Sequence, residues 1–262
     1  MPHPDHEKNR EAWNELVEVH INHPDYMTQA VIDGESSLKW IEREALGNVA
    51  GKHLLHLQCQ FGLDTLSWAH RGAIVTGVDI SDESIKRANE IKVKAGHKEA
   101  EFIRSDVLDL IGVIDKKFDI VFQSYGTHCW ISDIYKWAEV VAHYLKPGGT
   151  FFIVDGHPIT VLYYDPPMKY FDTEPERTLH APDYCDTEYR IKGELVEWQH
   201  PLSEIINALI EAGLIIEHVG EYNFGYYKEG EGWTERDDRY WLPPGGLSPH
   251  PLMMSIKARQ PE

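Results

Sequence analysis

The chain has 262 residues, of which 42% are hydrophobic and 26% are charged, so it is long enough to bury a sizeable α/β core. Its formal net charge of −18 argues against nucleic acid and anionic membranes as partners, because both are bound through Lys and Arg. The three cysteines, Cys59, Cys129 and Cys185, form no CxxC pair, and the polar amino terminus lacks the apolar segment of a signal peptide. No apolar run is long enough to span a membrane. We therefore expect a cytoplasmic protein that holds no metal.

The first fifty residues are expected to be helical, with breaks at Pro24 and Gly34. A second short helix is expected over 38–46. The apolar residues of the first helix recur at spacings of three and four, which is typical of one buried helix face: Trp13, Leu16 and Val17.

Strand and helix patterns then alternate along the chain. Helices are predicted from Asp64, as N-cap, to about Arg71, from the N-cap Ser81 to Gly96, and over 131–145. The apolar runs that precede and follow them predict strands over 53–57, 73–79, 100–106, 118–124 and 150–156. Such βα units in a row imply an α/β fold with a mostly parallel sheet covered by helices on both faces.

The alternation breaks after residue 156. Residues 157–202 and 225–250 are rich in aromatic residues without a clear period, so they are expected to be insertions. A helix over 203–213, capped by Ser203, and strands over 214–224 and 251–260 are expected to complete the sheet.

The stretch "LLHLQCQFGLDTL" (54–66) is placed like a nucleotide-binding turn, with a strand, a loop ending in Gly62 and a helix start. Backbone N–H groups at a helix start attract a ligand, and a side chain at Gly62 would block its approach. However, Gln58 and Gln60 stand where such loops carry glycine, and His56 stands where an acidic residue is customary. A plain strand-to-helix turn therefore remains an alternative.

Acidic residues follow the next two strands. Asp79 comes 17 residues after Gly62, the placement of a carboxylate that accepts both hydroxyls of a ribose. Its alternative role is to cap the following helix, although Ser81 already serves there. Asp106 is placed to accept the exocyclic amine of adenine, with the Val107 N–H beside the ring, but it is also compatible with a solvated turn.

These residues together resemble a class I S-adenosylmethionine (SAM) dependent methyltransferase, of the small-molecule bacterial branch. The resemblance rests on the 54–66 loop, "GVDIS", "IRSDV", "FDIVFQSYG" and "LKPGGTFFIVD". It implies a doubly wound seven-stranded sheet whose last strand is antiparallel, with insertions after strands 5 and 6. It also implies SAM as cofactor, contacted by Gln58, Cys59, Gly62, Asp79, Ile80, Asp106, Val107 and Gln123.

The resemblance also implies a division of the chain into one methyltransferase domain. Its parts are an N-terminal helical cap (1–50) over the cofactor cleft, a cofactor-binding core (51–156), an insertion (157–202) and the C-terminal part of the sheet (203–262). The methyl acceptor is expected to be a small molecule bound among aromatic residues, which alternatively only pack the insertions onto the sheet. The candidates are Tyr26, Tyr125, Trp130, Tyr184 and Trp233.

No general base stands out, because His157 and His200 are more typical of structural histidines. Two other functions stay open. A fold that binds SAM or S-adenosylhomocysteine (SAH) without turnover is suggested by His56, Gln58 and Gln60. A nicotinamide dehydrogenase is disfavoured because the GxGxxG spacing is absent and the "LKPGG" turn favours the methyltransferase.

Overall fold

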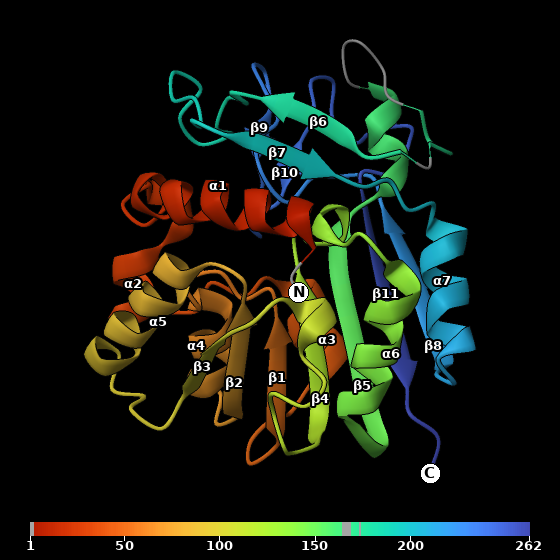
Figure 1. Ribbon diagram of the computed structural model, residues 1–262. Coiled ribbons are helices and arrows are strands. Elements are labelled where there is room, and N and C mark those ends of the chain that lie inside the picture. The colour runs from red at the N-terminus through yellow and green to blue at the C-terminus, as the bar shows by residue number, and fades with distance from the viewer. Residues whose placement is uncertain (1–2, 164–168, 173) are drawn as a thin grey trace.

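The computed structural model describes residues 3–163, 169–172 and 174–262. Its centre is a seven-stranded sheet with the strand order β3-β2-β1-β4-β5-β11-β8 (Figure 1). The strands are β1 (His53–Leu57), β2 (Ile74–Asp79), β3 (Glu101–Arg104), β4 (Phe118–Ser124), β5 (Leu145–Gly156), β8 (Ile215–Tyr222) and β11 (Met253–Arg259).

The first five strands are parallel, and β11 runs antiparallel to both β5 and β8. The expected doubly wound sheet with a reversed last strand is therefore confirmed. The order changes direction at β1, since β2 and β3 lie on one side of it and β4 and β5 on the other. In open α/β sheets a ligand binds at the carboxyl ends of the strands beside such a switch.

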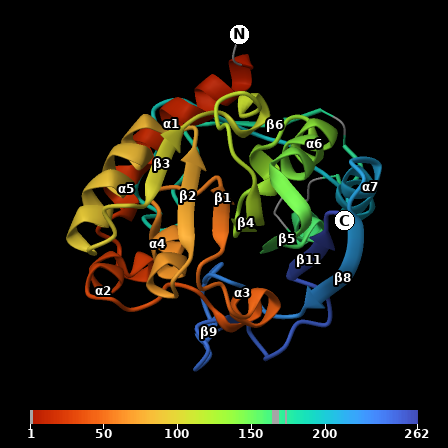
Figure 2. The same ribbon diagram turned by 90° about the horizontal axis from the view of Figure 1, so that it is seen from below.

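Helices cover both faces of the sheet, because alternate strand residues are apolar toward each face (Figure 2). Leu55, Val121 and Phe151 pack with helices α6 (Ile134–Tyr144) and α7 (Leu202–Glu211). Their chain neighbours pack on the other face. That face is covered by α2 (Thr28–Ile32), α3 (Trp40–Leu46), α4 (Leu63–His70) and α5 (Asp82–Lys94).

Some predicted boundaries are wrong. The N-cap of α4 is Gly62 in a left-handed conformation, not Asp64, and the N-cap of α7 is Pro201 without a side-chain bond, not Ser203. Helix α6 begins at Ile134 after an Asp133 cap, because residues 128–130 form the separate 3-10 turn η3 (His128–Trp130). Ser81 does cap α5, since its hydroxyl accepts the Ser84 N–H.

The N-terminal segment lies over the carboxyl ends of the central strands (Figure 1). Helix α1 (Pro4–His20) is followed by the 3-10 turn η1 (Pro24–Tyr26), and α1 buries Leu16 and Val17 as the spacing predicted. Two short hairpins complete this side, and both come from the predicted insertions. They are β6 (Glu176–Leu179) with β7 (Glu194–Glu197), and β9 (Thr234–Glu235) with β10 (Trp241–Leu242). The remaining 3-10 turns are η2 (Val107–Asp109) and η4 (Pro158–Tyr163).

Surface ion pairs tie α1 to the elements beside it. On the α5 side, Arg10 pairs with Asp82, and Glu18 accepts from Arg87 at 2.5 Å. On the hairpin side the pairs are Lys8 with Glu194 at 2.7 Å and Asp5 with Arg177 at 2.8 Å. Helix α1 is therefore held between the Rossmann-like core and the first insertion.

Within the described ranges, no helix has both the length and the hydropathy needed to traverse a bilayer.

Candidate active site

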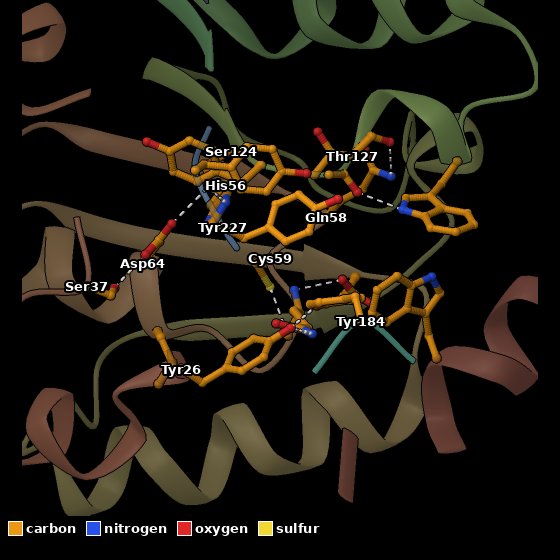
Figure 3. A pocket seen from close by; sticks show the side chains of 18 of the residues that line it. Tyr26, Ser37, His56, Gln58, Cys59, Asp64, Ser124, Thr127, Tyr184 and Tyr227 are labelled. Atoms are coloured by element: carbon orange, nitrogen blue, oxygen red, sulfur yellow. Dashed lines mark hydrogen bonds between the residues drawn. The ribbon is translucent and has the colours of Figure 1, made fainter. Parts of the chain in front are cut away.

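A cavity of about 670 Å³ lies at the carboxyl ends of β1–β4, and residues of α1 and η1 also line it. Figure 3 shows part of its lining. This volume is within the range of sites that enclose a small ligand. Its walls include ten of the predicted site residues: Gln58, Cys59, Asp79, Ile80, Asp106, Val107, Tyr26, Tyr125, Trp130 and Tyr184. Residues far apart in the sequence are thus brought to one place.

Three predicted residues do not line the cavity: Gly62, Gln123 and Trp233. Gly62 has φ +82°, and a Cβ there would meet the Phe102 ring at 2.5 Å. Its missing side chain therefore makes room for Phe102 rather than for a ligand. Trp233 packs against Gly225, where an added Cβ would lie 2.9 Å from the indole.

Gln123 does not reach the cavity itself but holds Gln58, which lines it. Its side chain is fully buried, accepts the Trp137 indole N–H at 2.9 Å and donates to Gln58 Oε1 at 2.7 Å. Gln58 in turn donates to the Thr127 carbonyl at 3.1 Å. This chain of hydrogen bonds fixes the Gln58 amide at the cavity wall, with one N–H left to donate to a ligand.

Gln58 and Gln60 keep the backbone of a glycine-rich loop. Their φ angles are +53° and +50°, in the left-handed region that favours glycine. The side chain of Gln60 contributes compensating hydrogen bonds, since its Nε2 lies 3.2 Å from both His20 Nδ1 and the Tyr26 hydroxyl. The loop therefore has the shape that its sequence position predicted, despite the two substitutions.

Asp79 lies at the end of β2 with its carboxylate directed to the cavity. One oxygen accepts the Gln60 N–H and the other accepts the Ser81 N–H, both at 2.8 Å. Each oxygen has a further lone pair, so two ligand hydroxyls can still be accepted. Burial raises the pKa of Asp79 to about 6, although these backbone N–H groups oppose the shift.

Asp106 is paired with a residue that the sequence analysis did not single out. His6 of α1 lies with Nδ1 2.5 Å from the carboxylate, and the Leu108 N–H donates to its other oxygen at 2.9 Å. Burial acts to raise the pKa of Asp106, but the hydrogen bond and charge of His6 outweigh it, and the pKa is lowered. No motif signalled His6, because only the fold brings α1 to β3.

Tyr26 and Tyr184 lie together on another part of the cavity wall, and their hydroxyls are hydrogen bonded to each other. Tyr26 also lies 3.1 Å from His20 Nδ1, and His20 Nε2 lies 2.7 Å from Asp183. His20 and Asp183 are both buried. The Cys185 sulfur and the side-chain N and O atoms of His20 and Asp183 lie within 4.8 Å of one another, a grouping that could hold a metal ion. The His20–Asp183 distance, however, is that of a direct hydrogen bond.

The loop after β4 is held by Asp155, another buried residue that the sequence did not reveal. Its carboxylate accepts the N–H groups of Gly126, Thr127 and His128 and lies 3.0 Å from His128 Nδ1. Although burial acts to raise the pKa of Asp155, His128 and the N–H donors lower it to about 2. This anchored loop positions Tyr125 and Trp130 on the cavity wall.

His56, where the loop customarily has an acid, is 3% exposed and has its Nδ1 2.8 Å from Thr65 Oγ1. Burial lowers the pKa of His56 to about 4, so it is neutral at pH 7. Asp64 lies nearby on the wall and accepts hydrogen bonds from the hydroxyls of Ser37 and Ser124 (Figure 3).

The cavity is acidic overall. The basic side chains on its walls, histidines apart, are Lys39, Lys228 and Arg239. Its carboxylates are Asp25, Asp64, Asp79, Asp106, Glu197 and Glu235. An excess of carboxylates suits a ligand with positive charge and opposes the pyrophosphate of a dinucleotide, so it disfavours the dehydrogenase alternative.

The strand order and the reversed last strand give the Rossmann-like α/β fold that class I methyltransferases share. A family model described as a methyltransferase domain matches residues 55–153, so this segment is similar to that family. The chain is 30% identical over 142 residues to an uncharacterized methyltransferase of Synechocystis, covering 53% of this chain and 64% of that protein. It is 31% identical over 116 residues to a ubiquinone biosynthesis O-methyltransferase of Nitrosospira multiformis, covering 44% and 46%. The chain thus spans less than two thirds of either curated relative.

Solved structures show the same fold. A putative SAM-dependent methyltransferase of Listeria monocytogenes aligns with a TM-score of 0.60 at 19% identity, over 85% of this chain and 98% of that one. The DhpI–SAH complex aligns with a TM-score of 0.60 at 18% identity, over 100% and 99%. At these identities the likenesses show the shared fold.

Proposed function

We propose that the protein transfers the methyl group of SAM to a small-molecule acceptor. The observation that carries this proposal is the acidic cavity at the β1–β4 strand ends, where Asp79 keeps acceptor lone pairs and lies on the same walls as a cluster of aromatic residues. When bound, SAM supplies a methyl group activated by its sulfonium charge.

The cofactor is proposed to bind along the strand ends. Asp79 accepts the ribose hydroxyls, and Asp106, held by His6, accepts the adenine amine, with Ile80 and Val107 beside the ring. Gln58 and Cys59 lie at the loop that faces the rest of the cofactor, and Gln123 orients Gln58. These roles require no metal.

The acceptor is proposed to bind between the N-terminal cap and the insertions. Tyr26, Tyr125, Trp130 and Tyr184 line this part, and Trp13 packs against Trp130 at a centroid distance of 5.4 Å. Such rings give a dry pocket in which alignment of nucleophile, methyl and sulfur accounts for much of the rate. Where the acceptor loses a proton, Tyr26 gives a route to His20, which Asp183 orients.

The wider organisation is also part of the proposal: one methyltransferase domain over 1–262, in the cytoplasm, without nucleic acid or membrane partners. The net charge of −18 supports the choice of a small neutral or cationic acceptor over a polyanion.

Incubation with SAM labelled in the methyl group and a metabolite extract tests the activity. Transfer of label to a small organic product is expected, and Asp79→Ala is expected to reduce it at limiting SAM. SAH binding without transfer to any product would instead favour a protein that holds the cofactor without turnover.

A further inference from the structure

Three carboxylates, Asp64, Asp79 and Asp106, lie on the strand-end side of the cavity, and they differ in the partners that balance their negative charge. Asp106 is paired with His6, and Asp79 accepts two backbone N–H groups. Asp64 accepts only hydroxyl groups, from Ser37 Oγ at 2.5 Å and Ser124 Oγ at 2.9 Å. Among the described residues, no Lys, Arg or His forms an ion pair with Asp64. It is therefore an aligned carboxylate without a direct ion-pair partner, and Lys39 of the same cavity acts on it only through longer-range charge.

The helix does not require this carboxylate as its cap. The N-cap of α4 is Gly62, and the Asp64 side chain faces the cavity from the first turn (Figure 3). His56 beside it is neutral at pH 7, because burial lowers its pKa to about 4, so it leaves the charge of Asp64 unmatched. Two hydroxyls fix the orientation of the carboxylate, and its remaining lone pairs are free for a ligand.

The strand order gives the position of Asp64 relative to the cofactor. Asp106 follows β3, Asp79 ends β2, and Ser124, which donates to Asp64, ends β4 on the other side of β1. The ribose of SAM or SAH carries the adenine on one side and the amino-acid chain on the other. With the ribose at Asp79 and the adenine toward Asp106, the amino-acid end points toward Asp64.

We propose that Asp64 binds the ammonium group of the cofactor's amino-acid end. The proposal rests on the proposed function, since it assumes SAM or SAH in this cavity. The ammonium donates charge-assisted hydrogen bonds to the carboxylate, which Ser37 and Ser124 hold in place. The negative charge absent from position 56 is thereby supplied from the first turn of α4.

Calorimetric titration with three ligands tests this assignment. SAH carries the ammonium and the carboxylate, S-adenosyl-3-thiopropylamine carries the ammonium alone, and 5′-methylthioadenosine carries neither. Asp64→Asn is expected to weaken the first two by about tenfold to a hundredfold, as for one charged hydrogen bond. Binding of 5′-methylthioadenosine is expected to change less than about twofold, because all its contacts remain.

Two control variants separate the possible causes. Glu235→Gln removes one charge from the same cavity at another position, so it is expected to leave the ratio of SAH to 5′-methylthioadenosine affinity unchanged. Asp79→Asn is expected to weaken all three ligands, because all carry the ribose. Asp64→Glu keeps the charge, so its ratio of SAH to 5′-methylthioadenosine affinity is expected to exceed that of Asp64→Asn.

The outcomes distinguish this inference from the proposed function. If Asp64→Asn binds SAH as tightly as the wild type, or loses all three ligands equally, the ammonium role is overturned while the cofactor assignment stands. If the wild type binds neither SAH nor 5′-methylthioadenosine, the cofactor assignment itself fails. Thermal unfolding of each variant checks that the fold is retained. Should Asp64→Asn not fold, the ratio of SAH to 5′-methylthioadenosine affinity in Asp64→Glu is compared with that of the wild type, and an unchanged ratio would overturn the ammonium role, because a longer side chain displaces the carboxylate.

Discussion

At the scale of single residues, Asp79 shows how burial prepares a carboxylate for a ligand. Two backbone N–H groups orient it, yet its pKa is raised to about 6 because burial disfavours its charge. A carboxylate that accepts two ribose hydroxyls must be ionised, so ligand binding and deprotonation are linked.

We therefore expect SAH affinity to fall as the pH falls through 6. The unliganded protein takes up a proton at Asp79 below this pH, and that proton must leave on binding, so the apparent Kd rises by about tenfold per pH unit. Asp79→Asn should bind about tenfold to a hundredfold more weakly at pH 8 and lack this component of the pH dependence. Asp79→Ala should bind more weakly still, since Asn keeps one acceptor.

Titration calorimetry between pH 5 and pH 8 measures both effects. A parallel loss of affinity in the wild type and in Asp79→Asn would mean that another group titrates, and the ribose role of Asp79 would be wrong.

At the scale of elements, the N-terminal helix and the first insertion are joined by a buried contact. His20 ends α1 and lies 2.7 Å from Asp183, with both side chains fully buried. Asp183 also accepts the N–H groups of Cys185 and Asp186, both at 2.9 Å. The contact fixes the wall that carries Tyr26 and Tyr184, so it links the stability of α1 to the shape of this part of the cavity.

His20→Asn is expected to lower the free energy of unfolding by about 3–5 kcal/mol, because it leaves the Asp183 carboxylate buried without its partner. Urea denaturation followed by tryptophan fluorescence measures this loss. His23→Asn is the matched control, since His23 is partly exposed and lies 3.7 Å from Asp25, and it should cost less than about 1 kcal/mol. Equal losses in both variants would contradict a specific role for the buried pair.

At the scale of the whole molecule, the sheet was predictable because its strands are continuous apolar runs separated by glycine and capping residues. The sequence also predicted that Asp79 and the 54–66 loop lie together, since strand ends in a parallel sheet meet at one edge, and both line the cavity. His6, Asp64 and Asp155 were not recognised as site residues, because their importance depends on partners 27 or more residues away along the chain. Local sequence patterns carry no information on such pairs.

The sequence predicted where the insertions lie but not the secondary structure within them. Residues 157–202 and 225–250 appeared aperiodic, yet each contributes a short hairpin to the walls or roof of the site. The two strands of β9–β10 are only two residues each, too short for an alternating pattern to emerge.

The ion pairs that tie α1 to its neighbours have a kinetic consequence. Because residues of α1 and η1 line the cavity, we expect release of SAH to require movement of these elements and to be a gated step. Exposed ion pairs weaken as salt screens them, so SAH should dissociate faster at 0.5 M than at 0.05 M NaCl. Stopped-flow displacement of SAH measures the rate, and Arg87→Gln should bring the low-salt rate toward the high-salt one. A dissociation rate independent of salt would mean that these ion pairs do not control release and that SAH leaves by another route. The surface charges would then have no effect on how long SAH stays bound.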